Sequence, residues 1–221
     1  MKLSELQITK DIKGAEKPQF GLYGNPLRDI FQKHGWNVLG KGVDAAVADH
    51  PNKNVVLKMF VSTSKYKHFV DLVKDHPNPH FPIFHKTIRE LPGTKFSYVM
   101  MEKLDEISDF YNNYFPEICA LMLSASKHGV DYLNRTSDMM PTFTPKRWFK
   151  NKIGVGVNDF IAYPELVWNK IDKPDDAWFQ ACDLLFGAFK EANMNLMSNI
   201  DFTPQNFMLR GDILVITDPF I

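Results

Sequence analysis

The chain has 221 residues, and its 44% apolar and 13% aromatic content is that of a globular protein, with room for one large domain or two small lobes. Lysine and arginine together number 26, as do aspartate and glutamate, so no net charge draws the chain to nucleic acid or to a membrane surface. No apolar run approaches the roughly 18 residues of a membrane span, and residues 1–20 show no signal peptide. We therefore expect a soluble, cytoplasmic protein in which Cys119 and Cys182 are reduced core thiols.

The N-terminal half alternates short apolar runs with turns. Residues 1–35 indicate an extension whose one short helix, Pro26 to His34, stops at Gly35. Beyond it the pattern predicts three strands, one amphipathic helix and two further strands. The strands are Trp36–Leu39, one that ends near Val47, Val55–Phe60, Phe81–Ile88 and Phe96–Met101, and the helix places Tyr66, Phe69, Val70 and Val73 on one face.

The C-terminal half is mainly helical by its apolar spacing. Residues 102–106 form a polar connector, which we interpret as the boundary between the two halves. Residues 134–158 have the least periodic composition and are expected to be loops, and the basic residues among them favour a solvated surface over a nucleic-acid patch. The predicted helices are a short one through Ile107, Phe110 and Tyr111, then Pro116 to about Leu133, Asp159 to Trp168, and Pro174 to about Asn193 with Asp172 as its cap.

Residues 201–221 carry the most informative pattern. Apolar runs at residues 207–209 and 213–216 flank a Gly-Asp turn and predict a hairpin. Asp201 and Asn206 precede the first run, and Asp218 ends the second. A carboxylate that accepts a proton, together with an amide oxygen and a second carboxylate that hold Mg²⁺, are the groups that phosphoryl transfer needs. Each residue alone has a structural explanation as a turn cap, a loop amide or a strand end, so the order of the three is what favours catalysis.

Two features further upstream fit the same chemistry. Gly40 and Gly42 let backbone amides approach phosphate oxygens without an intervening Cβ, although an isolated Gly-x-Gly pair is more often a plain hairpin turn. Lys58 lies inside an apolar strand, where a buried ammonium needs an anionic partner. A lone strand lysine is more often found at a sheet edge with its head group in water. The sequential order of all these parts favours phosphoryl transfer over chance.

Across residues 36–220 this order resembles the protein-kinase-like fold, and within it the small serine/threonine protein kinases of short-tailed bacteriophages. The glycine pair is similar to the kinase glycine-rich loop, with Ala45 in place of the third glycine, and the strand lysine is similar to the phosphate-binding lysine of kinases. The matching segments are Leu39–Val47, Val55–Lys58, Tyr98–Leu104 as last strand and hinge, Asn199–Asn206 as catalytic loop, and Thr217–Pro219 as the metal-binding motif.

The resemblance implies an α+β, bilobal fold with ATP and Mg²⁺ as cofactors. An extension at residues 1–35 would be followed by an N-lobe and hinge at residues 36–104, with an antiparallel sheet and one helix, and by a reduced, mainly helical C-lobe at residues 105–221. The implied catalytic residues are Asp201, Lys58, Asn206 and Asp218, and the implied metal ligands are Asn206 and Asp218. The implied nucleotide-binding residues are Gly40, Gly42, Val47, Lys58, Met101 as gatekeeper, and Glu102 and Leu104 through their backbone groups.

The chain also departs from the kinase pattern in other respects, and Asn199 and Ile200 stand where the catalytic loop of kinases has histidine and arginine. No glutamate occurs between residues 16 and 90, so the helix glutamate that pairs with the strand lysine in kinases is missing. Asp71 and Asp75 are the candidates to replace it. No activation segment or peptide-binding subdomain follows Asp218, so we expect a C-lobe built from residues 105–193.

We therefore expect an ATP- and Mg²⁺-dependent kinase that phosphorylates serine or threonine in host or phage proteins within the host cytoplasm, without a nucleic-acid or membrane partner. Two alternatives stay open. One is a catalytically inactive, kinase-like protein that binds nucleotide and captures a host factor, which the missing glutamate favours. The other is a small-molecule kinase similar to the antibiotic phosphotransferases, which share the Asp-x₄-Asn…Asp layout.

Overall fold

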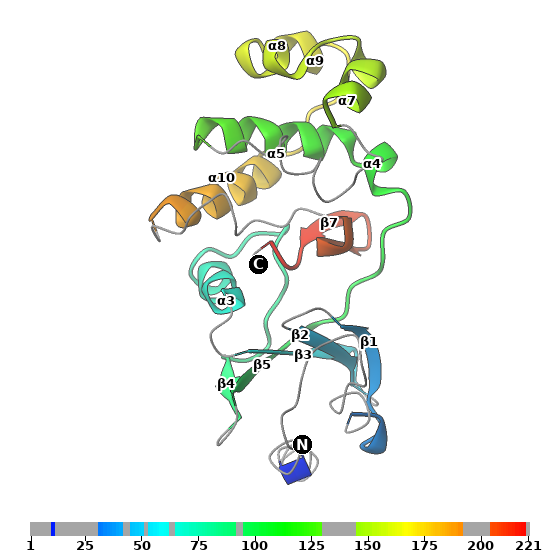
Figure 1. Ribbon diagram of the computed structural model, residues 1–221, viewed down its shortest axis with the longest axis vertical. Helices are drawn as coiled ribbons and strands as arrows, with labels where there is room; N and C mark the ends of the chain where they lie inside the picture. The colour runs from blue at the N-terminus through cyan, green and yellow to red at the C-terminus, as the bar shows by residue number, and fades with distance from the viewer. Residues whose placement is uncertain are drawn as a thin grey trace. The chain divides into compact units, whose positions relative to one another are not determined.

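The described part of the chain is α+β, with a five-stranded antiparallel sheet, a two-stranded hairpin and several helices (Figure 1). The computed structural model describes residues 10–11, 31–41, 45–50, 53–61, 65–91, 95–129, 145–191 and 204–219. The chain divides into two compact units. Unit 1 comprises Met1–Asp75 and Pro82–Leu104, and unit 2 comprises His76–Phe81 and Asp105–Ile221.

The sheet of unit 1 has the strand order β1-β2-β3-β5-β4, and all of its neighbours pair antiparallel. Its central strand, β3, is buried along nearly its whole length, which explains why its sequence is an apolar run rather than an alternating one. The strands are β1 (Asn37–Lys41), β2 (Ala45–Asp49), β3 (Val55–Val61), β4 (Arg89–Glu90) and β5 (Phe96–Glu102).

The two faces of this sheet are covered differently. Leu57 and Met59 of β3 pack into a core cluster with Phe31 and Trp36, which precede β1. Alternate residues of a strand point to opposite faces, so Lys58 and Phe60 lie on the other side. There the helix α3 (Tyr66–Asp75) places its Tyr66 ring 5.2 Å from the ring of Phe60. The residues that α3 buries are Tyr66, Phe69, Val70 and Val73, as their spacing predicts.

The strand predicted at Phe81–Ile88 is wrong. Within that range Phe84 forms only an isolated bridge with Met101. Regular pairing begins after it, at the two residues of β4. Pro82 has no amide hydrogen to donate to a ladder. The backbone of Phe81 is also engaged elsewhere, because its carbonyl accepts a hydrogen bond from Arg210 within unit 2.

The helices of unit 2 pack mainly through α5 and α10. At their contact the Trp178 indole N–H donates to the backbone carbonyl of Glu117 over 3.0 Å. The helices are α4 (Phe110–Asn113), α5 (Phe115–Lys127), α7 (Pro145–Ile153), α8 (Val157–Ala162), α9 (Glu165–Trp168) and α10 (Asp176–Glu191). Cys119 and Cys182 lie buried in α5 and α10 as free thiols, as expected, and burial raises the pKa of both.

Helix α7 overturns the loop expected for this part of residues 134–158. Its Phe149 is fully buried, and its ring lies 5.5 Å from that of Phe115 and 5.3 Å from that of Phe160. Tertiary packing of this aromatic side chain stabilises the helix. The remainder of the range up to residue 144 lies outside the described residues.

Other helix boundaries also differ from the prediction. Helix α5 ends at Lys127 rather than near Leu133, and Gly129 follows with a φ of +77°. The single helix predicted from Asp159 is two, because Pro164 stands at the N-cap of α9 and separates it from α8. The cap of α10 is Asp175 and not Asp172, since its Oδ1 accepts the Trp178 amide over 2.7 Å.

A hairpin ends the described chain, as its two apolar runs predict. It joins β6 (Phe207–Arg210) to β7 (Ile213–Ile216) and is preceded by the 3₁₀ turn η2 (Pro204–Asn206). Gly211 in the connecting turn has a φ of +59°, a backbone conformation that favours glycine.

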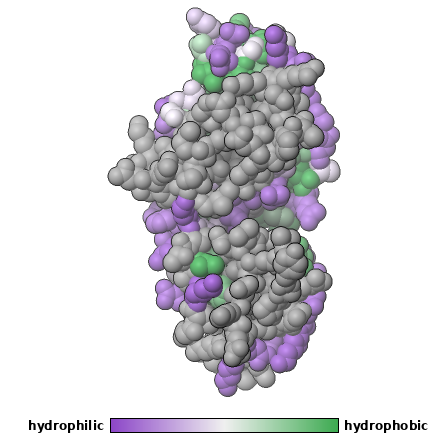
Figure 2. All heavy atoms as spheres, in the orientation of Figure 1, coloured by the Kyte–Doolittle hydropathy of each residue, from purple (hydrophilic) through white to green (hydrophobic). Residues whose placement is uncertain are grey.

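The surface of unit 2 at helices α7 to α9 mixes apolar and polar side chains (Figure 2). Tyr163 and Leu166 are the most exposed large apolar residues there, and isolated side chains of this kind are normal on a globular surface. No helix within the described ranges is long and apolar enough to cross a membrane.

Candidate functional site

Three of the predicted nucleotide-binding residues, Gly40, Val47 and Lys58, come together in the sheet of unit 1, and Val99 continues their row. Gly40, Val47, Lys58 and Val99 are direct neighbours across four successive strands. Directly paired residues share a face, so Val47 and Lys58 lie on the face that α3 covers. Met101, two residues beyond Val99 in β5, lies on the same face. Gly42 is outside the described residues.

Lys58 is deeply buried, and an aromatic ring lies directly beneath its ammonium group. The residue is only 4% exposed, and its Nζ is 3.7 Å from the centroid of the Tyr66 ring. A cation this close to the face of an aromatic ring is attracted to it, and more strongly when both groups are removed from water. The phenol hydroxyl of Tyr66 in turn contacts the sulfur of Met101 at 3.7 Å.

Asp71 and Asp75 do not take the place of the missing glutamate. Both side chains are exposed, on residues outside the buried stripe of α3. A helix presents residues three and four apart on one face, and Tyr66 begins that face here. The described helix therefore brings a phenol ring to Lys58 where a carboxylate was expected.

The predicted hinge is held by its own strand neighbours. The amide of Glu102 donates to the carbonyl of Ile83 over 3.0 Å, and the Glu102 carboxylate accepts the Ile83 amide over 2.7 Å. An adenine contact at this residue would therefore need the carbonyl oxygen of Glu102 rather than its amide. Met101 and Leu104 are buried.

In unit 2 the hairpin brings Asn206 next to Asp218. The carbonyl of Asn206 accepts two hydrogen bonds from Thr217, from its amide over 2.8 Å and from its hydroxyl over 3.0 Å. Asp218 follows Thr217 directly, so the predicted metal ligands stand at the open end of one hairpin. Asp201, the predicted catalytic carboxylate in the C-terminal half of the chain, lies outside the described residues.

The donor set at this end of the hairpin suits Mg²⁺. An amide oxygen and a carboxylate are hard oxygen ligands, and Mg²⁺ is usually held by one or two such groups together with substrate phosphates. Among the described residues, no group of three or more His, Cys, Asp or Glu side chains could hold a metal by itself. Asn206 and Asp218 thus offer two oxygen ligands of the kind that Mg²⁺ takes.

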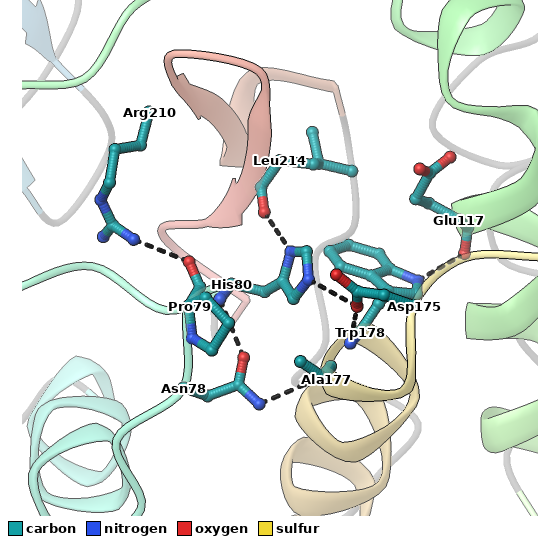
Figure 3. Close-up of polar contacts among 9 residues, drawn as sticks. All are labelled: Asn78, Pro79, His80, Glu117, Asp175, Ala177, Trp178, Arg210 and Leu214. Atoms are coloured by element: carbon teal, nitrogen blue, oxygen red, sulfur yellow. Dashed lines mark hydrogen bonds and ion pairs between the residues drawn. The ribbon is translucent and has the colours of Figure 1, made fainter.

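The hairpin is supported on both edges, which an isolated pair of strands needs for stability. On the β7 edge the Ile216 amide donates to the His80 carbonyl over 2.9 Å. The His80 Nδ1 is hydrogen-bonded to the Leu214 carbonyl over 2.7 Å (Figure 3). On the β6 edge Asp105 and Leu209 exchange two backbone hydrogen bonds of 2.9 and 2.8 Å. Asn206 and Asp218 are therefore carried by a fixed element.

His80 ties this hairpin to α10. Its Nε2–H donates to Asp175 over 3.0 Å, and its ring packs edge-on at 5.0 Å from the ring of Trp178 (Figure 3). Each ring nitrogen of His80 faces an oxygen acceptor, the Leu214 carbonyl for Nδ1 and the Asp175 carboxylate for Nε2. Burial opposes ionisation of Asp175, but the Trp178 amide and the His80 ring outweigh it and lower the pKa of that carboxyl below its ordinary value.

Two more side chains fix the segment that carries His80. The Asn78 side chain accepts the His80 amide over 2.8 Å and donates to the Ala177 carbonyl over 2.9 Å, and the Arg210 guanidinium donates to the carbonyl of Pro79 (Figure 3). Arg210 also donates to the carbonyl of Phe81. Sequence reasoning missed this network. A histidine between a proline and an aromatic residue is a weak signal, because its partners lie far away along the chain.

Comparison with known proteins gives no relative. No model of a known protein family matches the chain, and a search of curated proteins finds no similar sequence. The function therefore has to be inferred from the residues themselves.

Proposed function

We propose that the protein is an ATP- and Mg²⁺-dependent phosphotransferase with a protein-kinase-like, bilobal fold, and that it phosphorylates serine or threonine in host or phage proteins in the host cytoplasm. The observation that carries the proposal is the row Gly40–Val47–Lys58, in which a glycine backbone and a buried ammonium flank a valine on one sheet. Through its positive charge, a lysine at this position would bind nucleotide phosphates beside the glycine backbone.

Each residue has one task in this proposal. The backbone of Gly40 and Gly42 would cover the phosphates, and Lys58 would neutralise two of them. Val47 and Met101 would contact the adenine. ATP, when bound, supplies the phosphoryl group that is transferred.

The acceptor side of the reaction depends on the C-terminal residues. Asn206 and Asp218 would hold Mg²⁺ through the amide oxygen and the carboxylate. Asp201 would orient the attacking hydroxyl and accept its proton. Positioning and charge neutralisation would then supply most of the rate gain.

Transfer of labelled phosphate from ATP to casein, and to the protein itself, tests the proposal. We expect Lys58→Met, Asp201→Asn and Asp218→Asn each to lower incorporation at least about 100-fold, because each removes a charge that acts in the transition state. Asp71→Asn is the matched control, since it removes an exposed carboxylate, and it should transfer phosphate like wild type. Equal incorporation by wild type and Asp201→Asn would rule out the role of Asp201.

One observation favours the alternative of a protein that binds nucleotide without turnover. Helix α3 offers Lys58 the neutral ring of Tyr66 and not a carboxylate. Thermal unfolding with ATP, with and without Mg²⁺, separates the two functions, because a ligand that binds only the folded state raises Tm. A higher Tm without any phosphate transfer would support the non-catalytic protein.

A further inference from the structure

We propose that Tyr66 is the positioning residue of Lys58, and that the face of its ring holds the ammonium group by a cation–π contact on the side where α3 brings no carboxylate. The inference rests on the proposed function, because the position of Lys58 matters for activity only if this residue binds nucleotide phosphates. The contact itself can be tested without any nucleotide.

The geometry of the contact is favourable. The Lys58 Nζ is 3.7 Å from the ring centroid, well within the ~6 Å at which such contacts act. Both residues are buried, with Lys58 in the central strand and Tyr66 at the first position of α3. Water therefore weakens the attraction little.

The ring is held rigidly by neighbours from several elements. It lies 5.2 Å from the ring of Phe60, 5.7 Å from that of Phe69 and 6.4 Å from that of Phe84, between ring centroids. Its hydroxyl contacts the sulfur of Met101 in β5. A ring fixed by β3, α3, β5 and the segment before β4 is a preorganised support for the ammonium group.

A ring differs from a carboxylate in its effect on charge. The ring carries no net charge, so its contact with the ammonium of Lys58 does not itself cancel the positive charge, whereas a carboxylate in the same place would. Dissolved salt should weaken the attraction between the ammonium and the ring only slightly, since both groups are buried. The arrangement therefore suits a lysine whose task is to attract phosphate.

The first experiment observes the contact directly in the nucleotide-free protein. We expect the ε-methylene signal of Lys58, in ¹H–¹³C spectra of protein with ¹³C-labelled lysine, to be shifted upfield by the Tyr66 ring. Lys58→Met identifies the signal by its loss. The upfield shift should persist in Tyr66→Phe, which keeps the ring, and disappear in Tyr66→Leu.

The second experiment measures KM for ATP and kcat of the same variants. We expect Tyr66→Leu to raise KM roughly 5- to 30-fold, the range that loss of a buried cation–π contact implies, and Tyr66→Phe to stay within about twofold of wild type. Phe31→Leu is the matched control, because it removes a fully buried ring on the opposite face of the same sheet. It should leave KM unchanged.

The outcomes distinguish this inference from the proposed function. A Lys58 signal at its ordinary position in wild type overturns the inference, even if Tyr66→Leu does not fold. A KM for Tyr66→Leu equal to that of wild type also overturns it, provided that Lys58→Met abolishes transfer. Undiminished phosphate transfer by Lys58→Met would instead contradict the proposed function, while an upfield Lys58 signal would still establish the contact.

Discussion

At the scale of single residues, the pKa of a buried acid or base depends on the groups that contact it. Glu117 in α5 is an example. Its Oε2 has no hydrogen-bond partner among the described residues. Burial raises the pKa of Glu117, and the nearby His80 only partly opposes that effect. The folded protein therefore favours the protonated carboxyl.

This carboxyl should make stability depend on pH. A raised pKa in the folded state means that the contribution is fully present below the ordinary value of 4.5 and is lost as the pH rises through the folded pKa. We expect Glu117→Gln, a neutral side chain of the same shape, to raise the free energy of unfolding by about 1 kcal/mol at pH 7. Little change is expected at pH 4.

Urea unfolding at both pH values measures this difference. Glu106→Gln is the control, because its side chain is exposed, and it should behave like wild type at either pH. A Glu117→Gln protein that is less stable than wild type at pH 7 would show that the carboxylate is favourable where it lies.

Residue-scale prediction from sequence succeeds where the local pattern is enough. The apolar run at Val55–Phe60 predicts the strand β3, and that strand forms, while the two alternatives for Lys58, buried or at a sheet edge, are decided by the structure in favour of burial. Its partner on α3 was not predicted, because Tyr66 has the same place in the apolar stripe whether it packs against aliphatic groups or under an ammonium group. Apolar spacing identifies the face of a helix but not what that face contacts.

At the scale of elements, the β6–β7 hairpin depends on one turn. Gly211 has a φ of +59°, and a Cβ added there would meet nothing within 4 Å. The cost of Gly211→Ala is therefore conformational and not steric, about 1 kcal/mol of the free energy of unfolding. Gly211→Asn should cost less, because asparagine tolerates this conformation.

Thermal unfolding of the two variants beside wild type tests this prediction. The expected order of Tm is wild type, then Gly211→Asn, then Gly211→Ala. An alanine variant as stable as wild type would mean that the turn adopts a different backbone conformation in solution.

Elements differ in how far sequence predicts them. The apolar stripe of α10 and the two runs of the hairpin are strong local signals, and both elements form. Helix α7 and the segment from Phe81 to Ile88 were mispredicted. In each case contacts with distant residues decide the conformation, through the burial of Phe149 and through the hydrogen bonds of Phe81.

At the scale of the whole molecule, the chain leaves unit 1 after Asp75, contributes six residues to unit 2 and returns at Pro82. His80 holds this insertion through its ring and its backbone carbonyl. We expect His80→Ala to lower the stability of unit 2 by about 2–3 kcal/mol, because two ring hydrogen bonds are lost and the Leu214 carbonyl is left unpaired.

Amide hydrogen exchange reports this effect by region. Exchange should accelerate in residues 76–81 and at Ile216, whose amide donates to His80, while the amides of β3 and β5 in unit 1 exchange as before. Asn78→Ala, which leaves the His80 ring contacts in place, should have a smaller effect. Uniform acceleration across both units would show that they unfold together.

The amino-acid sequence by itself determined the α+β class, the strand-rich first half and helical second half, and the terminal hairpin, because each follows from apolar spacing, glycine and proline within a few residues. Only the tertiary structure decided that Tyr66 lies under Lys58, that His76–Phe81 belongs to unit 2, and that His80 clamps the hairpin to α10. These contacts join residues that are distant in the chain, and a local sequence pattern does not indicate which distant residues pack together.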